Sequence, residues 1–305
     1  MQLPFSPYLS VFLRVLGVDP LHLHSHKTMH IYTQPRGGLG NQLFQYAAAL
    51  YFAQKHNATV EILPIPDDRL TSAGHPRPFL LTEFSLTHPI QPNPLPSTHY
   101  LEPAALQWTF HPDLTLPDLV TLEGHFQAWQ YAAAVEPQLR RELTLRRPPT
   151  GPNAEALTLI RQTDTPVSIH LRRGDYTLAI EGSAPLPLPY YRNAVQTLLR
   201  EVPNPTFFVF SDDPAFAQAH LPEALGLLPA SMLFLAHNND NNSHEDLRLM
   251  SACHHHIIAN STYSWWGAWL NPRPNRIVLT PQEWMKPSIP HPDVIPSSWL
   301  RIPTI

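Results

Sequence analysis

Hydrophobic positions in the second half of the chain follow two patterns that replace each other in turn. Short, continuous apolar runs predict buried strands, and apolar residues at three- and four-residue spacing predict helices. In chain order the expected elements are a helix at 154–162, a strand at 167–170, a helix at 190–201, a strand at 206–210, a helix at 243–252, a strand at 255–259, a tryptophan-rich helix after Ser264 and a strand at 277–279. This alternation implies a parallel sheet with helices on both faces.

The first half opens with a strand, a glycine turn and a helix. Residues 30–34 form the expected strand, residues 35–41 contain three glycines, and the helix that follows carries apolar residues from Leu43 to Tyr51. This geometry points free backbone N–H groups at an anion. A strand is also expected at 59–61.

Further along the first half, the pattern is less regular. A strand beginning at Val120 leads into a loop, and a helix at 135–145 is broken at Pro137. Residues 64–117 are interrupted by prolines and predict no element.

A proline-rich segment at 146–152 is the best linker signal, so we expect domains at 29–150 and 151–305. Residues 1–28 differ from the rest. Their apolar run contains Arg14 and is too short to span a bilayer. They also lack the basic start and the cleavage site of a signal peptide. We expect an extension outside the core, with Met29 as the native start. The alternative is an amphipathic helix docked on the protein or on a membrane surface.

The composition describes a folded protein without an obvious nucleic-acid partner. Of its 305 residues, 43% are hydrophobic and 14% charged, and the net charge is −4. The single cysteine, Cys253, excludes an intrachain disulfide and fits a reducing compartment. Histidines are frequent, but His254 to His256 are consecutive and lack ligand spacing, and no Asp-x-Asp triplet occurs. We expect no catalytic metal.

Polar motifs follow three of the predicted strands. Arg172-Arg173-Gly174-Asp175 ends the first, Ser211-Asp212-Asp213-Pro214 the second, and Asn260-Ser261-Thr262-Tyr263-Ser264 the third. Ligands bind at the carboxyl ends of strands in open α/β sheets. An arginine fork fits phosphate oxygens, and Asp175 could hold the other arginine, Arg173, in place. A solvated surface turn is the alternative for this arginine motif.

Each motif suits one part of a nucleoside diphosphate. Hydroxyl and N–H groups at Ser261, Thr262 and Ser264 would cradle a phosphate where a helix begins. A carboxylate at Asp212 or Asp213 would accept hydrogen bonds from guanine, and Arg172 would neutralise the leaving β-phosphate. The alternative for Asp212, as for Asn41, is a helix N-cap.

The loop after the strand at 120 combines aromatic and polar groups. His125 and Trp129 lie in it, and a ring beside polar groups suits a sugar. We expect this loop to contribute to the acceptor site, and core packing is the alternative for Trp129.

Four segments together resemble the motifs of the bacterial α-1,2-fucosyltransferases, in the family's order. They are residues 37–47, 170–176, 210–213 and 260–269. The resemblance runs from about Met29 to the end. It implies a GT-B fold, with two Rossmann-like domains facing across a cleft. It also implies metal-independent, inverting transfer of L-fucose from GDP-β-L-fucose to the 2-hydroxyl of a galactoside, without a cofactor.

The resemblance also assigns roles to individual residues. Arg172 would contact the β-phosphate, His170 and the Asp212–Asp213 pair would contact guanosine, and Asn41 would approach the diphosphate from the other domain. The full donor set is Gly38, Gly40, Asn41, His170, Arg172, Arg173, Asp212, Asp213, Asn260, Ser261, Thr262 and Ser264.

The general base is less well defined. Glu181 is the only acid in the window where related enzymes place one. Asp175 is the rival, although a tight bond to Arg173 would weaken it as a base.

Other functions compete with this interpretation. A nicotinamide-dependent oxidoreductase would use Gly38, Gly40 and Glu61 but leaves the three strand ends without a purpose. A sugar-binding or adhesion module could use the Arg-Gly-Asp tripeptide at 173–175, and a fucosyltransferase of different linkage is a further alternative. The expected location is the cytoplasm, with peripheral association at the inner face of the membrane as an option.

Overall fold

A computed structural model describes residues 28–65, 77–92, 95–178, 184–286 and 289–304. Two predictions fall on residues outside these ranges. They are the extension before Met29, of which only Thr28 is described, and the candidate base Glu181.

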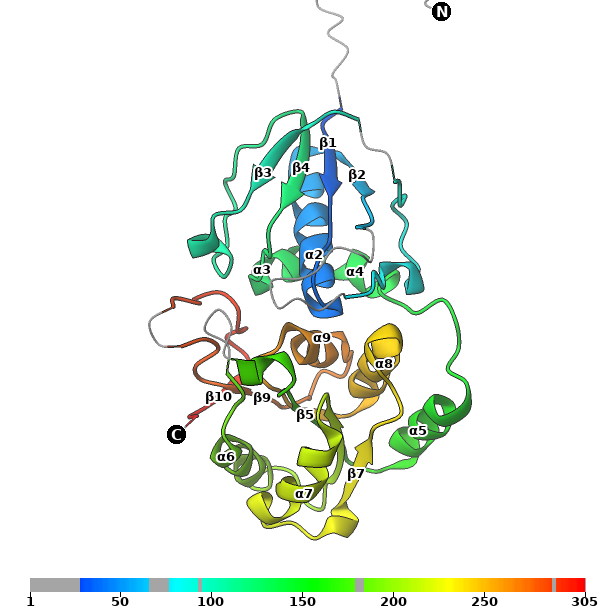
Figure 1. Ribbon diagram of the computed structural model, residues 1–305, viewed down its shortest axis with the longest axis vertical. Helices are drawn as coiled ribbons and strands as arrows, with labels where there is room; N and C mark the ends of the chain where they lie inside the picture. Colours follow the sequence, from blue (N-terminus) through cyan, green and yellow to red (C-terminus); the bar gives the residue numbers. More distant parts are fainter. Residues whose placement is uncertain (1–27, 66–76, 93–94, 179–183, 287–288, 305) are drawn as a thin grey trace, which may run out of the picture.

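The first half forms a parallel four-stranded sheet in the order β2-β1-β4-β3. Its strands are β1 (His30–Thr33), β2 (Thr59–Ile62), β3 (Thr98–Leu101) and β4 (Leu119–Glu123). Helix α2 (Leu39–His56) packs against this sheet, with α3 (Trp129–Ala134) and α4 (Glu136–Glu142) near its lower end in Figure 1. Strand β3 lies in the segment for which no element was expected. It is an exposed edge strand, so its side chains carry no buried apolar pattern.

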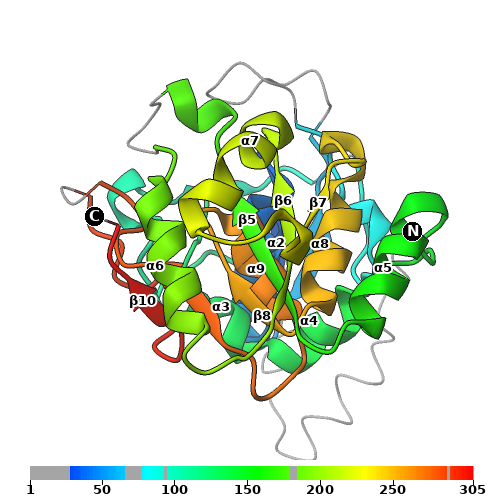
Figure 2. The same cartoon turned by 90° about the horizontal axis from the view of Figure 1, so that it is seen from below.

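The second half forms a parallel six-stranded sheet in the order β10-β9-β8-β5-β6-β7. The strands are β5 (Pro166–Leu171), β6 (Thr206–Ser211), β7 (Met232–Leu235), β8 (His255–Ile257), β9 (Val278–Pro281) and β10 (Leu300–Ile302). Helices α6 (Leu188–Leu198) and α7 (Pro214–Leu225) share one apolar cluster with these strands. A second apolar cluster contains buried residues of α5 (Gly151–Gln162), α8 (Ser243–Ala252) and α9 (Thr262–Leu270), together with residues of the first half. Figure 2 shows these helices from below. The predicted alternation and parallel sheet are confirmed, while β7 and β10 were not expected.

One helix boundary differs from the expectation for a physical reason. The segment 135–145 is not one broken helix, because α3 ends before it and Pro137 lies in the first turn of α4. Proline fits there since it has no N–H to donate. Helix α8 has the expected bounds, and the hydroxyl of its first residue, Ser243, donates to the carbonyl of Asp240, at 3.2 Å.

The linker at 146–152 is fixed to the first half of the chain. The backbone N–H of Arg146 donates to the Glu83 carbonyl, at 2.9 Å, and its Nε donates to the Phe84 carbonyl, at 2.7 Å. Helix α5 begins at Gly151, so the end of this segment is already helical.

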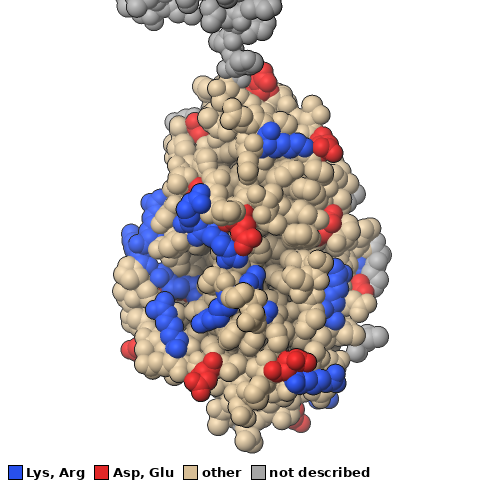
Figure 3. All heavy atoms as spheres, turned by 180° about the vertical axis from the view of Figure 1, so that it is seen from behind, with Lys and Arg blue, Asp and Glu red and all other residues tan. Residues whose placement is uncertain are grey.

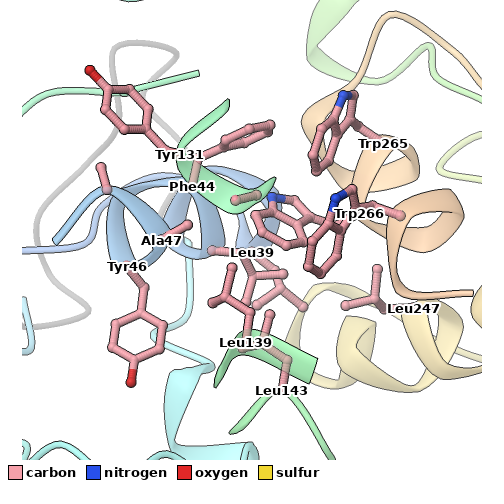
Figure 4. Packing of buried hydrophobic residues seen from close by; sticks show 14 of the residues in the cluster. Leu39, Phe44, Tyr46, Ala47, Tyr131, Leu139, Leu143, Leu247, Trp265 and Trp266 are labelled. Carbon is pink, nitrogen blue, oxygen red and sulfur yellow. The ribbon is translucent and has the colours of Figure 1, made fainter. Parts of the chain in front are cut away.

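The two halves are joined by an apolar interface. The ring of Phe44 in α2 lies 4.6 Å from that of Trp265 and 5.2 Å from that of Trp266, both in α9 (Figure 4). Leu139, Leu143 and Leu247 belong to the same buried cluster. Trp265, Trp266 and Trp269 are all buried, so α9 is apolar on more than one side. This packing holds the first turns of α2 and α9 next to each other.

A cation also crosses the junction between the halves. Arg140 in α4 donates to the carbonyls of Trp269 and Leu270, at 3.1 and 3.3 Å, and lies 4.7 Å above the Trp269 ring. Figure 3 shows that Lys and Arg side chains gather at mid-height on the face opposite to that of Figure 1. In the part of the chain that the structure describes, no helix combines the length and the apolarity needed to cross a bilayer.

Candidate active site

The three motif-bearing strand ends lie side by side. Strand β5 is the neighbour of both β6 and β8, and all three run parallel. Their carboxyl ends therefore meet at one edge of the sheet, on the side that faces the first half of the chain (Figure 1).

Arg172 is the central cation of this edge. Its Nη2 lies 2.6 Å from Oδ1 of Asp175, and its Nη1 lies 2.9 Å from Oδ2 of Asp212. The side chain is only 18% exposed, and its guanidinium lies 5.3 Å from the ring centre of Tyr176. Burial alone would lower the pKa of Arg172, but the two carboxylates outweigh it and keep the pKa above its ordinary value. The guanidinium is thus permanently charged and held in a fixed orientation.

The pairing of Asp175 differs from the sequence expectation. Asp175 does not hold Arg173, because it begins a 3₁₀ turn, Asp175–Leu178, that brings its carboxylate back to Arg172. Arg173 instead pairs with Asp213, at 3.2 Å, and stacks on the ring of Phe216, at 3.4 Å. The segment is therefore not a solvated surface turn, and its Arg-Gly-Asp tripeptide is not a free adhesion loop.

A cation that the sequence analysis missed completes this cluster. Nη2 of Arg77 lies 3.0 Å from Oδ2 of Asp175, and Nη1 of Arg77 lies 2.8 Å from Oδ2 of Asp240. Arg77 precedes β3 in the proline-broken segment of the first half, and no local pattern marks it. Only the contact between the halves brings it to the site.

Gly174 is required by the close approach of two strand ends. A Cβ atom at this position would lie well inside contact distance of Oδ2 of Asp212. Oδ1 of Asp212 accepts from the backbone N–H of Arg173, at 2.8 Å. The ends of β5 and β6 are locked together through this carboxylate.

The two aspartates after β6 have different roles within the protein. Asp213, not Asp212, caps a helix, since its Oδ1 accepts from the N–H of Phe216 at the start of α7, at 3.0 Å. Asp212 orients Arg172. Contact of either carboxylate with guanine stays a prediction.

His170 is a buried, neutral imidazole beside the arginine. Burial, with the charge of Arg172 as a second cause, lowers the pKa of His170 to about 3. Its Nδ1 has no hydrogen-bond partner among the residues described. Its ring lies 5.6 Å from that of Tyr263. The side chain is therefore uncharged, and a guanosine contact of His170 stays a prediction.

The first turns of α2 and α9 meet at Gly40. A Cβ atom on Gly40 would lie 2.5 Å from the backbone carbon of Thr262 and from the nitrogen of Tyr263. Asn41 is not the N-cap of α2, which is Gly38. Oδ1 of Asn41 accepts from Oγ1 of Thr262, at 2.8 Å, and from Nε2 of Gln127, at 3.0 Å. Two positive helix ends thus face the same region.

This packing contradicts the dinucleotide interpretation of the glycine turn. Gly40 allows helix-to-helix contact, and Glu61 pairs with His30, at 3.3 Å. Neither residue has the role that a nicotinamide enzyme would give it.

The groups after β8 are largely engaged within the protein. Oγ of Ser264 donates to the Ser261 carbonyl, at 3.2 Å, and the hydroxyl of Thr262 is bound to Asn41. Nδ2 of Asn260 donates to the carbonyls of Ala184 and Trp284, both at 3.3 Å. Oδ1 of Asn260 is buried without a hydrogen-bond partner in the described ranges. The phosphate cradle at these residues stays a prediction.

The loop after β4 lies next to this region. Gln127 connects it to Asn41. Trp129 is the first residue of α3, not a loop residue; it is partly buried, and its backbone N–H donates to the Asp293 carbonyl, at 2.8 Å. The N–H groups of His125 and Phe126 donate to Oε2 of Glu102, at 2.7 and 2.9 Å. An acceptor role for His125 and Trp129 stays a prediction.

No group of three or more His, Cys, Asp or Glu side chains suited to a metal ion occurs within the residues that are described. In the histidine triplet, the two ring nitrogens of His256 bind Ser168 and Asn271, each at 2.8 Å. Nδ1 of His255 accepts from the N–H of Ile277, at 2.9 Å. These rings have structural partners.

Comparison with known proteins gives the family context of this site. Residues 7–291 match the family model described as glycosyl transferase family 11. This match includes part of the segment before Met29. The O-antigen biosynthesis glycosyltransferase WbnK of Escherichia coli is 28% identical over 303 residues, covering 83% of this chain and 94% of that protein. The alpha-1,2-colitosyltransferase of Escherichia coli is 29% identical over 290 residues, covering 87% of this chain and 96% of that protein.

A eukaryotic relative and a solved structure extend the comparison. Galactoside alpha-(1,2)-fucosyltransferase 1 of Homo sapiens is 26% identical over 251 residues, which are 77% of this chain and 64% of that protein. The crystal structure of NodZ alpha-1,6-fucosyltransferase soaked with GDP-fucose superposes with a TM-score of 0.54 at 16% identity, covering 86% of this chain and 97% of that one. This likeness confirms the GT-B fold.

Proposed function

The chain belongs to glycosyl transferase family 11, and we propose that it transfers L-fucose from GDP-β-L-fucose to the 2-hydroxyl of a terminal galactoside, with inversion and without a metal ion. The α-1,2 linkage is supported by the names of two relatives, a colitosyltransferase and a galactoside fucosyltransferase. The colitosyltransferase makes GDP-colitose a second candidate donor.

The observation that carries this proposal is the position of Arg172. It is a largely buried, permanently charged guanidinium just after β5, the strand that lies between β6 and β8. A fixed cation stabilises most strongly the group on which negative charge develops. The β-phosphate of a leaving nucleoside diphosphate is such a group.

Inverting transfer has a simple balance of bonds. The acceptor oxygen attacks the anomeric carbon from the face opposite to the diphosphate, the bond from that carbon to the phosphate oxygen breaks, and GDP leaves with the electron pair. The acceptor proton goes to a base or to water. In this structure each oxygen of Asp175 is held by an arginine, so Asp175 is not free to act as that base while both ion pairs persist.

Metal independence is supported by the charges on the protein. Arg172 and Arg77 carry permanent positive charges that would compensate the diphosphate without a divalent cation.

A direct assay tests the proposal. The purified full-length chain is incubated with GDP-fucose or GDP-colitose and a β-galactoside such as lactose, and GDP release is followed. The product linkage and anomeric configuration are then read by NMR. We expect an α-1,2-linked product that requires the acceptor. A different linkage, or no GDP release from either donor, contradicts the proposal.

A further inference from the structure

Arg77 is a cation that the first half of the chain contributes to the site of the second half. Its side chain is 15% exposed and lies between the carboxylates of Asp175 and Asp240. Asp175 separates it from Arg172, so the two guanidinium groups are bound to the two oxygens of one carboxylate.

Gln42 in the glycine motif holds the segment that carries Arg77. Nε2 of Gln42 donates to the carbonyl of Pro78, at 2.8 Å, and Oε1 accepts from the N–H of Leu80, at 3.0 Å. The same Nε2 donates to the carbonyl of Gly37, at 2.9 Å. Gln42 is 1% exposed. This buried amide in α2 fixes the backbone next to Arg77.

We propose that Arg77 is a second phosphate-binding cation of the donor site, and that the β-phosphate bridges Arg172 and Arg77 as the carboxylate of Asp175 does in this structure. The inference rests on the proposed nucleoside diphosphate donor. Two oxygens of a phosphate have nearly the spacing of two carboxylate oxygens, and guanidinium forks bind both kinds of anion.

The charges around Arg77 favour an exchange of partners. Asp240 is 62% exposed, so its ion pair with Arg77 adds little stability and is easily given up. Arg172 keeps Asp212 as a partner when Asp175 is displaced. A phosphate bound in this way is held by both halves of the chain, and its developing charge is shared by two arginines.

Binding of GDP and of GMP to the full-length protein, measured by calorimetry, tests this assignment. GMP has no β-phosphate, so the ratio of the two affinities reports contacts to that group alone. We expect Arg77→Met to weaken GDP binding roughly ten- to a hundredfold, the range for hydrogen bonds to charged groups, and to leave GMP binding within about twofold. Arg77→Lys retains the charge but not the fork, so its affinity for GDP should lie between that of the unmodified protein and that of Arg77→Met.

Arg140→Met is the matched control, because Arg140 also crosses between the halves but binds carbonyls and the Trp269 ring. It should leave the ratio of GDP to GMP affinity unchanged. If Arg77→Met weakens the binding of GDP and GMP equally, or weakens the binding of neither, Arg77 only joins the halves and the inference is wrong. If the unmodified protein binds neither nucleotide, the proposed GDP-sugar donor is wrong. This outcome differs from the one that contradicts the role of Arg77 alone.

Asp240→Asn provides a test in the opposite direction. It removes the carboxylate that competes for Arg77 and leaves the arginine in place. We expect GDP binding to be as tight as in the unmodified protein or tighter. Weaker GDP binding with unchanged GMP binding would mean that Asp240 itself supports the phosphate, against the proposed exchange.

Discussion

The side-chain oxygen of Asn41 accepts a hydrogen bond from the hydroxyl of Thr262, 2.8 Å away and 221 positions later in the chain. This bond ties the first turn of α2 to the first turn of α9. Each residue belongs to a motif that suggested a phosphate contact. In the structure the two motifs hold each other.

Loss of Arg172 should abolish transfer. Arg172→Ala removes the cation that we propose faces the leaving group, which should cost on the order of 3 kcal/mol, or about a hundredfold or more in kcat. Arg172→Lys should restore little, because one ammonium group cannot bind a phosphate and Asp212 together as the fork can. Steady-state kinetics with GDP-fucose checks this, and near-normal turnover of Arg172→Ala would refute the assignment.

Gly40→Ala should destabilise the protein, whereas Gly38→Ala should not. A methyl group on Gly40 collides with the backbone of α9, which cannot move without separating the halves. Overpacking of this kind costs about 1–3 kcal/mol. At Gly38 a methyl group meets nothing within 4 Å. Thermal unfolding of the two variants gives the comparison, and equal melting temperatures would contradict the tight contact.

Glu102 should make the unfolding free energy fall as pH rises. Burial raises the pKa of Glu102 to about 7 from an ordinary value of 4.5, although two backbone N–H groups oppose the shift. The protonated form is therefore the one that folding favours. This contribution is complete below about pH 4.5 and is lost as the pH rises through 7. It amounts to at most about 3 kcal/mol.

Glu102→Gln is the matched variant for this pH effect. Its amide oxygen can still accept from the N–H groups of His125 and Phe126, but the side chain no longer ionises. Urea unfolding should show that the free energy of unfolding falls less between pH 5 and pH 8 for the variant than for the unmodified chain. Identical drops would show that Glu102 is not the source.

Fucosyl transfer should persist in EDTA. The proposed charge compensation comes from Arg172 and Arg77, so chelation removes nothing that the reaction needs. Initial rates with and without EDTA, after exhaustive dialysis, should agree. Recovery of a lost rate by added Mg²⁺ or Mn²⁺ would overturn the metal-free mechanism.

Much of the second half could be predicted from the sequence because its signals are local. Strands β5, β6 and β8 are continuous buried runs, and the helices between them bury one apolar face. The parallel order then places their carboxyl ends together without further information. Strand β3 was missed because an exposed edge strand needs no apolar run.

The sequence by itself determined the alternating elements, the motifs at the strand ends and the resemblance to a family, since each depends on neighbours in the chain. The tertiary structure decided which charges meet. Arg77 and Asp175 form an ion pair although they are 98 positions apart. Asp175 pairs with Arg172 and not with Arg173, because a 3₁₀ turn brings its carboxylate back to Arg172. Gly40 is needed for a helix contact that exists only after Phe44 packs on Trp265 and Trp266. Periodicity encodes elements, but the pairing of distant side chains depends on how the two halves dock.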